Sequence, residues 1–301
     1  MIRQKSAGDK LFDIIVVVIM LMTIITTLYP FMNATAISLN DADDTSKGGI
    51  TFYPRIPTTR NYELIFQNSK VYKAYGITIA RTIVGTLGAL LFTSAFAFGM
   101  AHSNLKFRRF YTMFCLIPMY FGGGLIPFYF LIKWLGMINT FWVYISPGLV
   151  GIFNMIIMRT YFQGIPIALE ESARIDGANY LTVFWKIILP ISSPIIATIA
   201  LFVGVGQWNA WFDAAIFVTK QDLKPMQSVL LSIISEARFA EALAATTGGP
   251  VSVGNIGRGV KTNVRSITMA TMIVTILPII MTYPFLQRYF VKGIMIGSLK
   301  G

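Results

Sequence analysis

Six long apolar runs, separated by more polar stretches, constrain this chain more than any other feature of its sequence. Each run has about twenty residues or more, enough for a helix to cross a hydrocarbon core of about 30 Å. Only 13% of the residues are charged, against roughly 25% in soluble domains, and mean hydropathy is +0.65. The sequence predicts an all-α polytopic membrane protein with one transmembrane domain. The expected spans cover about 12–36, 75–100, 110–132, 141–161, 192–218 and 267–290.

The first run follows basic residues and ends in Ala34-Thr35-Ala36, a pattern that a cleaved signal peptide would also show. Its apolar core is longer than the 7–15 residues that such a signal needs, which favours a membrane span. Six spans place both termini on the same side of the membrane.

Lysine and arginine outnumber aspartate and glutamate by 25 to 13, for a net charge of +12. In a membrane protein this excess indicates anchors beside anionic lipid rather than a nucleic-acid surface. The loops and tails on one side of the membrane contain as many lysine and arginine residues as the loops on the other side. Short loops carry more weight than long ones, and the 101–109 turn is the shortest basic loop. The termini and this turn are therefore expected in the cytoplasm, with outer loops at 37–73 and 220–265.

The polar segment 165–190, between the fourth and fifth spans, has the features of a short surface helix. Pro166 suits a first helical turn, and Glu170 is placed to pair with Arg174 one turn later. Gly177 is suited to end the helix, because it adopts positive φ without strain. The segment also carries a narrow face of small residues and a proline before the fifth span: Leu169, Ser172, Ala173 and Pro190. On periodicity alone, an amphipathic helix lying on lipid is an alternative.

The spacing within this segment is more specific than its periodicity. Glu171-Ser172-Ala173, three residues, Gly177, nine residues, Ile187, one residue and Leu189-Pro190 resemble the EAA loop of ATP-binding-cassette importer permeases. Only Ser172 departs from that pattern, and it keeps a small side chain. The resemblance implies that 165–190 is a cytoplasmic coupling helix that docks on a partner ATPase. It assigns the contact to Leu169, Glu171, Ser172, Ala173, Asp176, Gly177 and Pro190.

Further motifs resemble the MalG-like carbohydrate permeases, in the branch named after LplC and YtcP, which is associated with oligosaccharides, including those of uronic acids such as alginate and pectin fragments. They are Phe121–Pro127, Leu135–Trp142, Met158–Phe162, Gly206–Trp211 and Gln287–Gly293. The resemblance implies a bacterial inner-membrane subunit that works with a second, homologous permease, two ATPase copies and an extracytoplasmic solute-binding protein.

The chain is not expected to be an enzyme. It contains no Gly-x-x-x-x-Gly-Lys-Ser/Thr loop, so ATP and Mg²⁺ are expected in the partner ATPase and no cofactor in this chain. It has no nucleophile elbow, and one cysteine, Cys115, with one histidine, His102, cannot form a metal-binding array. A stand-alone secondary transporter or channel is the alternative. The absence of buried charge chains in the spans speaks against it.

The third span contains Gly122, Gly123 and Gly124 between Pro118 and Pro127, and this set cannot hold a continuous helix. Broken backbone in a membrane is tolerated where it lines a watery cavity or is buried in protein. The break is therefore expected to face the solute path. A packing kink without solute contact is the alternative.

The fifth span gathers polar, aromatic and acidic side chains within two turns: Gln207, Trp208, Asn209, Trp211 and Asp213. Tryptophan stacks on sugar CH faces and amides bond hydroxyls, so these residues and the glycine break are expected to line one cavity for an oligosaccharide. An acidic oligosaccharide is the expected cargo. A neutral sugar is the alternative cargo. Asp213 would repel a carboxylate, so it is expected to bond a hydroxyl or to pair with Arg81, Arg258 or a partner's residue. The two tryptophans would otherwise serve as interfacial anchors.

Overall fold

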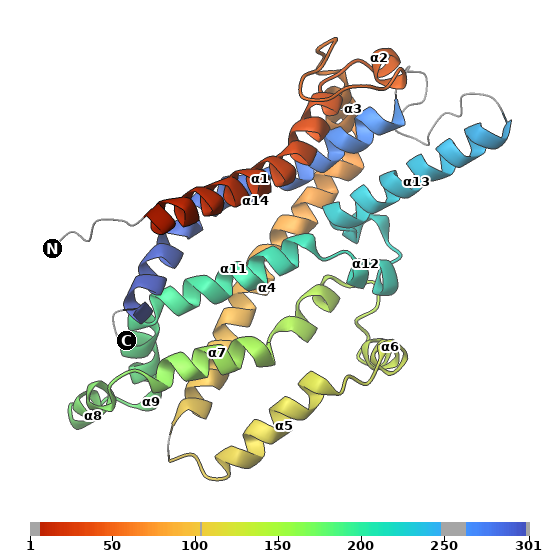
Figure 1. The fold of residues 1–301 in the computed structure, drawn as a ribbon. Coiled ribbons are helices and arrows are strands. Elements are labelled where there is room, and N and C mark those ends of the chain that lie inside the picture. Colours follow the sequence, from red (N-terminus) through yellow and green to blue (C-terminus); the bar gives the residue numbers. More distant parts are fainter. Residues whose placement is uncertain (1–6, 103, 248–262, 299–301) are drawn as a thin grey trace. The chain divides into compact units, whose positions relative to one another are not determined.

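The computed structural model describes residues 7–102, 104–247 and 263–298, and helices dominate them (Figure 1). The helices before the first bend are α1 (Ala7–Ser38), α2 (Ala42–Ser46), α3 (Arg60–Gln67), α4 (Ser69–Ala101) and α5 (Arg108–Tyr120). They are followed by α6 (Leu125–Trp134), η1 (Phe141–Tyr144), η2 (Ser146–Gly148), α7 (Ile152–Gln163), α8 (Ile167–Ile175) and α9 (Tyr180–Val183). The remainder are η3 (Phe184–Ile188), α10 (Leu189–Ile191), α11 (Ser193–Asn209), α12 (Phe212–Phe217), η4 (Gln221–Leu223), α13 (Met226–Thr247) and α14 (Val264–Ser298).

Three of the expected spans are continuous helices, and three are bent. The continuous ones are 8–38, 69–101 and 264–282. The bent ones are helix pairs: α5 with α6 at 112°, η1 and η2 with α7 at 44°, and 180–191 with α11 at 83°. The last pair differs from the expected span 192–218, because it begins within the predicted segment 165–190 and ends at Asn209. Counting each pair as one span gives up to six spans by length and composition. The described part of the chain is thus all-α, with the helices of a polytopic membrane protein.

The glycine break predicted in the third span is confirmed. α5 ends at Tyr120 and α6 begins at Leu125, with Gly124 at φ +85° between them. Within the range 192–218, α11 ends at Asn209 because Ala210 is extended, with ψ 127°, and the separate helix α12 follows. No glycine or proline marks this second interruption in the sequence.

The described residues form two compact units, one within 1–69 and 230–277 and the other within 70–229 and 278–301. In the second unit, one apolar core joins α4, α5, α7 and α11 through side chains that include Met155, Met158, Val183 and Ile199. A second core joins α6 to η1 and α12 through Ile132, Val143 and Phe217. These cores fix the helices that carry the candidate site.

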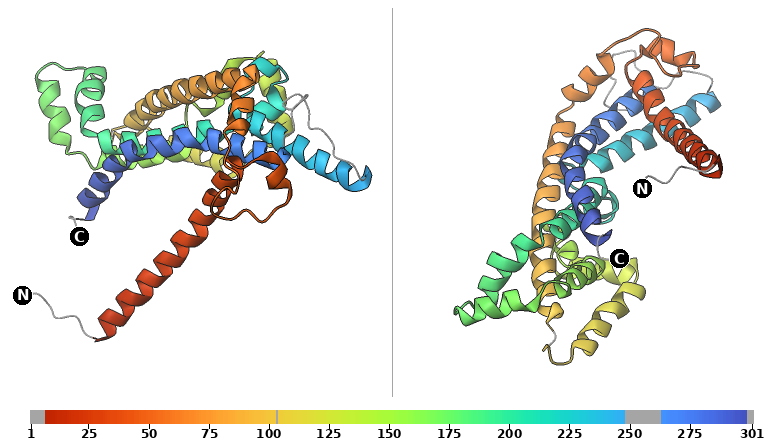
Figure 2. Two further views of the ribbon diagram at one scale, coloured as in Figure 1. Left: turned by 90° about the horizontal axis from the view of Figure 1, so that it is seen from above. Right: turned by 60° about the vertical axis from the view of Figure 1, so that its left-hand side comes forward.

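In the first unit, α1 runs as one straight helix into the segment that carries α2 and α3 (Figure 2). Polar bonds organise this segment around the buried Asn40, whose amide donates to Asp44 (3.0 Å) and accepts from the Ile56 N–H (2.9 Å). The hydrogen bond from Asn40, followed by that from Arg55, lowers the pKa of the Asp44 carboxyl. The predicted loop 37–73 is therefore a folded element.

Candidate functional site: the coupling segment and a buried arginine

The predicted end of the surface helix at Gly177 is confirmed. Gly177 has φ +86°, its N–H donates to the Arg174 carbonyl (3.0 Å), and the Ala178 N–H donates to the Ala173 carbonyl (2.9 Å). These two bonds form a Schellman motif, which satisfies the last carbonyls of α8 and favours glycine at the left-handed position. The sequence therefore fixes both the length of α8 and the direction in which the chain leaves it.

The side chains of α8 point mostly into solvent, and no residue of the helix is fully buried. Leu169 is 43% exposed and Ile175 is 86% exposed. Ala173 is the exception among the predicted contact residues, because it packs against the core cluster around Met158. The remaining predicted contacts, Glu171, Ser172, Asp176, Gly177 and Pro190, are exposed. The free face of α8 therefore includes Leu169 and Ile175, whereas Ala173 also holds the helix in place.

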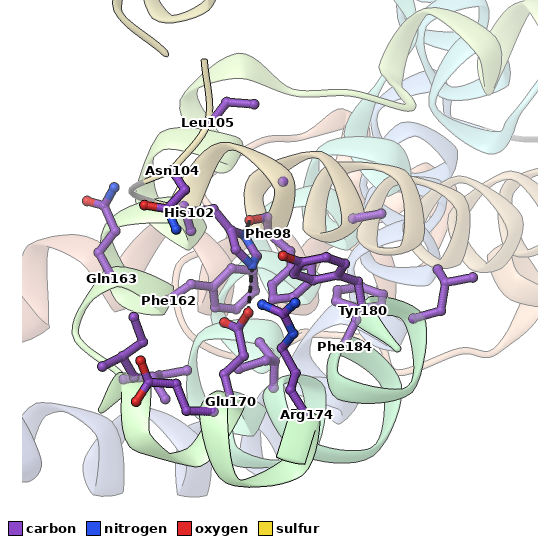
Figure 3. Close-up of a pocket in the computed structure, with 18 of the residues that line it drawn as sticks. Phe98, His102, Asn104, Leu105, Phe162, Gln163, Glu170, Arg174, Tyr180 and Phe184 are labelled. Carbon is purple, nitrogen blue, oxygen red and sulfur yellow. Dashed lines mark hydrogen bonds and ion pairs between the residues drawn. The ribbon is translucent and has the colours of Figure 1, made fainter. Parts of the chain in front are cut away.

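A pocket of about 810 Å³ lies between α8, α9 and the end of α4 (Figure 3). Glu170 and Arg174 do not form the expected pair. Glu170 Oε1 lies 3.1 Å from His102 Nε2, and the Arg174 guanidinium lies 4.7 Å from the centre of the Tyr180 ring. Sequence spacing missed His102 because 68 positions separate it from Glu170. The sequence contained one signal for this pairing. His102 lies in the 101–109 turn, which is expected on the same side of the membrane as 165–190.

Contacts at opposite ends of α4 agree with the expected division of the loops, in which 101–109 lies with 165–190 and 37–73 lies with 220–265. At the C-terminal end, His102 joins the 101–109 turn to α8. At the N-terminal end, Lys73 Nζ lies 2.7 Å from Asp222 Oδ1, which joins the start of α4 to the segment after α12. The short basic turn and the coupling segment therefore share one end of this unit.

Asp213 pairs with Arg81, as one of the predicted alternatives stated. Arg81 is 1% exposed, and its Nη2 lies 2.5 Å from Asp213 Oδ2. The guanidinium also donates to Gln207 Oε1 (3.1 Å) and to the Ala210 carbonyl (3.2 Å), and it lies 4.3 Å from the centre of the Tyr144 ring. This cluster, formed by Arg81, Tyr144, Gln207 and Asp213, stabilises the extended backbone between α11 and α12.

The other residues expected on the solute path are distributed differently. Trp208 is buried near Tyr75, with ring centres 6.4 Å apart, whereas Trp211 is 43% exposed. Asn209 is exposed and its Oδ1 accepts from Gln227 Nε2 (3.1 Å). A Cβ atom added to Gly122, Gly123 or Gly124 would meet no atom within 4 Å, so no described residue of this chain closes around the glycine break. A single cavity lined by both sets stays a prediction.

Arg258, one of the predicted partners of Asp213, lies in the part of the outer loop 220–265 that is outside the described residues. No group of three His, Cys, Asp or Glu side chains suited to a metal occurs among the residues that the structure describes.

Comparisons with known proteins agree with this geometry. Residues 94–296 match the family described as binding-protein-dependent transport system inner membrane component. LplC of Bacillus subtilis (strain 168) is 34% identical over 300 residues, covering 99% of this chain and 98% of LplC. The polygalacturonan/rhamnogalacturonan transport system permease protein YtcP of the same organism is 32% identical over 293 residues, covering 97% of this chain and 99% of YtcP.

A crystal structure of a bacterial ABC transporter involved in the import of the acidic polysaccharide alginate contains a chain with the same fold. The TM-score is 0.84 at 26% identity, and the match covers 95% of this chain and 99% of that one. The match confirms the resemblance drawn from the loop spacing. With a family match over two thirds of its length, and relatives aligned from end to end, this chain belongs to the binding-protein-dependent transport system inner membrane components, the permease subunits of ABC importers.

Proposed function

We propose that this chain is one of two permease subunits of an ATP-driven importer that takes up acidic oligosaccharides delivered by an extracytoplasmic binding protein. A second, homologous permease completes the path, and two ATPase subunits bind ATP and Mg²⁺. The observation that carries the proposal is α8, a short helix with an exposed face and a rigid C-cap on a loop between two membrane helices. Such a helix offers a partner protein a surface of fixed geometry to bind. In this arrangement α8, the 101–109 turn and both termini lie in the cytoplasm.

The proposed cargo rests on the relatives. Polygalacturonan, rhamnogalacturonan and alginate, named for two of the similar proteins, all contain uronic acids. A neutral cargo is the second candidate, because the arabinooligosaccharides transport system permease protein AraQ of Halalkalibacterium halodurans is also similar, at 27% identity over 91% of this chain.

Within this chain, the proposed solute contacts are the exposed Asn209 and Trp211, beside the interruption that Arg81 holds. Gln207 and Asp213 shape that interruption, and the buried Trp208 supports it. Gly122, Gly123 and Gly124 complete the path against the partner permease, which agrees with their open surroundings in the isolated chain.

Substitutions on the free face of α8 test the coupling role. Leu169→Asp and Ile175→Asp place a charge on side chains that make no core contact, so the chain should fold while the ATPase is lost from the purified complex. The measurement is co-purification of the ATPase with the two permeases, followed by sugar-stimulated ATP hydrolysis in nanodiscs. Tyr53→Asp, at a 78% exposed side chain in loop 37–73, is the matched control and should retain the ATPase. Normal hydrolysis in both α8 variants would refute the proposal.

The cargo is tested by comparing soluble oligosaccharides in the same assay. Oligogalacturonate or oligomannuronate should stimulate ATP hydrolysis in the presence of the binding protein, and arabino-oligosaccharides should not. Mass spectrometry of the ligand that co-purifies with the binding protein gives an independent answer. A neutral ligand in both measurements would favour the second candidate.

A further inference from the structure

His102 follows directly after α4, and both nitrogens of its ring have partners (Figure 3). Nδ1 lies 2.9 Å from the carbonyl oxygen of Phe98, one of the last four carbonyls of α4, which lack partners within the helix. Nε2 lies 3.1 Å from Glu170 Oε1 on α8. The side chains of His102 and Glu170 are 23% and 18% exposed, so the contact is largely sheltered from water.

Counting protons shows what this arrangement requires. A carbonyl oxygen only accepts, so Nδ1 must carry the hydrogen in its bond to Phe98. In a neutral imidazole Nε2 is then an acceptor, and an ionised carboxylate is also only an acceptor. The bond between Nε2 and Glu170 therefore exists only when the pair holds one additional proton. Imidazole is a stronger base than a carboxylate, so the proton resides on the ring.

The surroundings of the pair contain charges of both signs. The C-terminal end of the 33-residue α4 carries partial negative charge, which stabilises a cationic ring. From α8, Glu170 and Glu171 favour the cation and Arg174 opposes it. Arg108 at the start of α5 also opposes it, and Tyr180 of α9 lies edge-on to the imidazole with ring centres 5.3 Å apart. The end of α7 adds only uncharged groups to this pocket, Phe162 and Gln163.

We infer that His102 is a positioning residue for the coupling helix, fastening α8 to the end of α4 through a proton shared with Glu170. The inference rests on the coupling role proposed for α8. The bond holds a proton that the separated groups release, so it is favoured at low pH and is lost as the pH rises. Histidine is the side-chain type that ordinarily changes its charge between pH 5 and 8, so a test of the link between α8 and α4 should cover that range.

Coupling measured against pH tests this inference in the assembled transporter. For the wild type, the ratio of sugar-stimulated to basal ATP hydrolysis should fall several-fold between pH 6 and pH 8.5. In Glu170→Gln the amide N–H donates to a neutral Nε2 and the amide oxygen accepts from a protonated one, so the link exists in both states and the ratio should stay constant. His102→Gln replaces the ring by a permanent donor and should also remove the pH dependence. An identical pH profile in the wild type and both variants would overturn the inference.

A spectroscopic measurement keeps this test independent of ATP hydrolysis. His102 is the sole histidine of the chain, so ¹⁵N-histidine labelling of the full chain in nanodiscs, purified without a histidine tag, reports one ring. The expected spectra show the doubly protonated ring at low pH and the Nδ1–H tautomer at high pH. In Glu170→Gln the Nδ1–H tautomer should persist to lower pH. An Nε2–H tautomer, or equal titration in both proteins, would refute the shared proton even if α8 proved essential for coupling.

Discussion

Two of the pairs of a cation and a carboxylate in the second unit, Arg81 with Asp213 and His102 with Glu170, differ in the burial of the cation and in the number of its partners. The Arg81 guanidinium is 1% exposed and, besides Asp213, has three further partners in Gln207, Ala210 and Tyr144, while the Asp213 side chain is 25% exposed. His102 and Glu170 meet at a helix end beside a pocket, joined by one hydrogen bond.

The difference lies in the choice of cation as well as in burial. Arginine keeps its charge at every accessible pH and fits a carboxylate with two parallel bonds, so the Arg81 cluster is permanent. Histidine gains and loses its charge near neutrality, so the bond at α8 is reversible. One pair fixes the interruption between α11 and α12, and the other allows α8 to be attached or released.

The largest expected effect comes from leaving Arg81 without its carboxylate. Asp213→Asn keeps the shape but leaves a buried charge unpaired, which should cost about 3–5 kcal/mol of stability. Thermal unfolding of the purified chain measures the loss. The double variant Arg81→Met/Asp213→Asn should recover much of it, because no uncompensated charge remains. A single variant as stable as the wild type would show that the pair is not the permanent element described above.

A smaller effect is expected where α4 and α11 approach each other beside this cluster. A Cβ atom at Gly85 would lie 2.9 Å from the Gln207 amide, which is bonded to Arg81 and to the Tyr144 carbonyl. Gly85→Ala should therefore destabilise the chain by about 1–3 kcal/mol through overpacking. Gly76→Ala, on the same helix with no atom within 4 Å, is the control and should be neutral or stabilising. Equal melting temperatures for the two variants would contradict the close packing.

A substitution at the end of α8 is expected to cause a milder and more local destabilisation. Gly177→Ala forces a side chain into left-handed backbone at φ +86°, at a cost of about 1–2 kcal/mol. Amide exchange at Gly177 and Ala178 should accelerate, and coupling should weaken without loss of the membrane helices. Ser172→Ala, at an exposed position of the same helix, should leave exchange at both amides unchanged. Slow exchange in Gly177→Ala would show that the Schellman bonds do not depend on glycine.

The smallest effect concerns a pair in the first unit, in which the cation is the more exposed partner. Arg55 is 44% exposed and bonds the sheltered Asp44, whose pKa is lowered by Asn40 first and Arg55 second. The carboxylate is the form that stabilises the folded loop, so this stability is complete above the ordinary aspartate range near pH 4 and is lost as the pH falls through the lowered pKa. Exchange of the Ile56 amide, corrected for intrinsic rates, should accelerate in acid. Asp44→Asn should remove the acid dependence, and an unchanged profile would contradict the assignment.

The sequence predicts the helical class, the coupling segment and the break at Gly122–Gly124, because apolar length and glycine or proline spacing are local signals. It also places Arg81 among the partners of Asp213, since a buried acid requires a counter-charge. It does not reveal the interruption at Ala210, which depends on bonds from Arg81 and not on any helix-breaking residue. The pairing of His102 with Glu170 depends on tertiary packing of α4 against α8, which no periodicity encodes.

The length of α4 has a mechanical consequence. Its 33 residues extend about 50 Å, farther than the hydrocarbon core, and the helix is continuous throughout. Arg81, a buried side chain of this helix with several partners, lies about 18 Å from the beginning of the helix and about 30 Å from its end. When α4 pivots about Arg81, a tilt of the helix by about 5° displaces its α8 end by about 3 Å and the opposite end by less than 2 Å. A displacement of the α8 end therefore reaches the opposite end of α4 reduced in amplitude and increased in force.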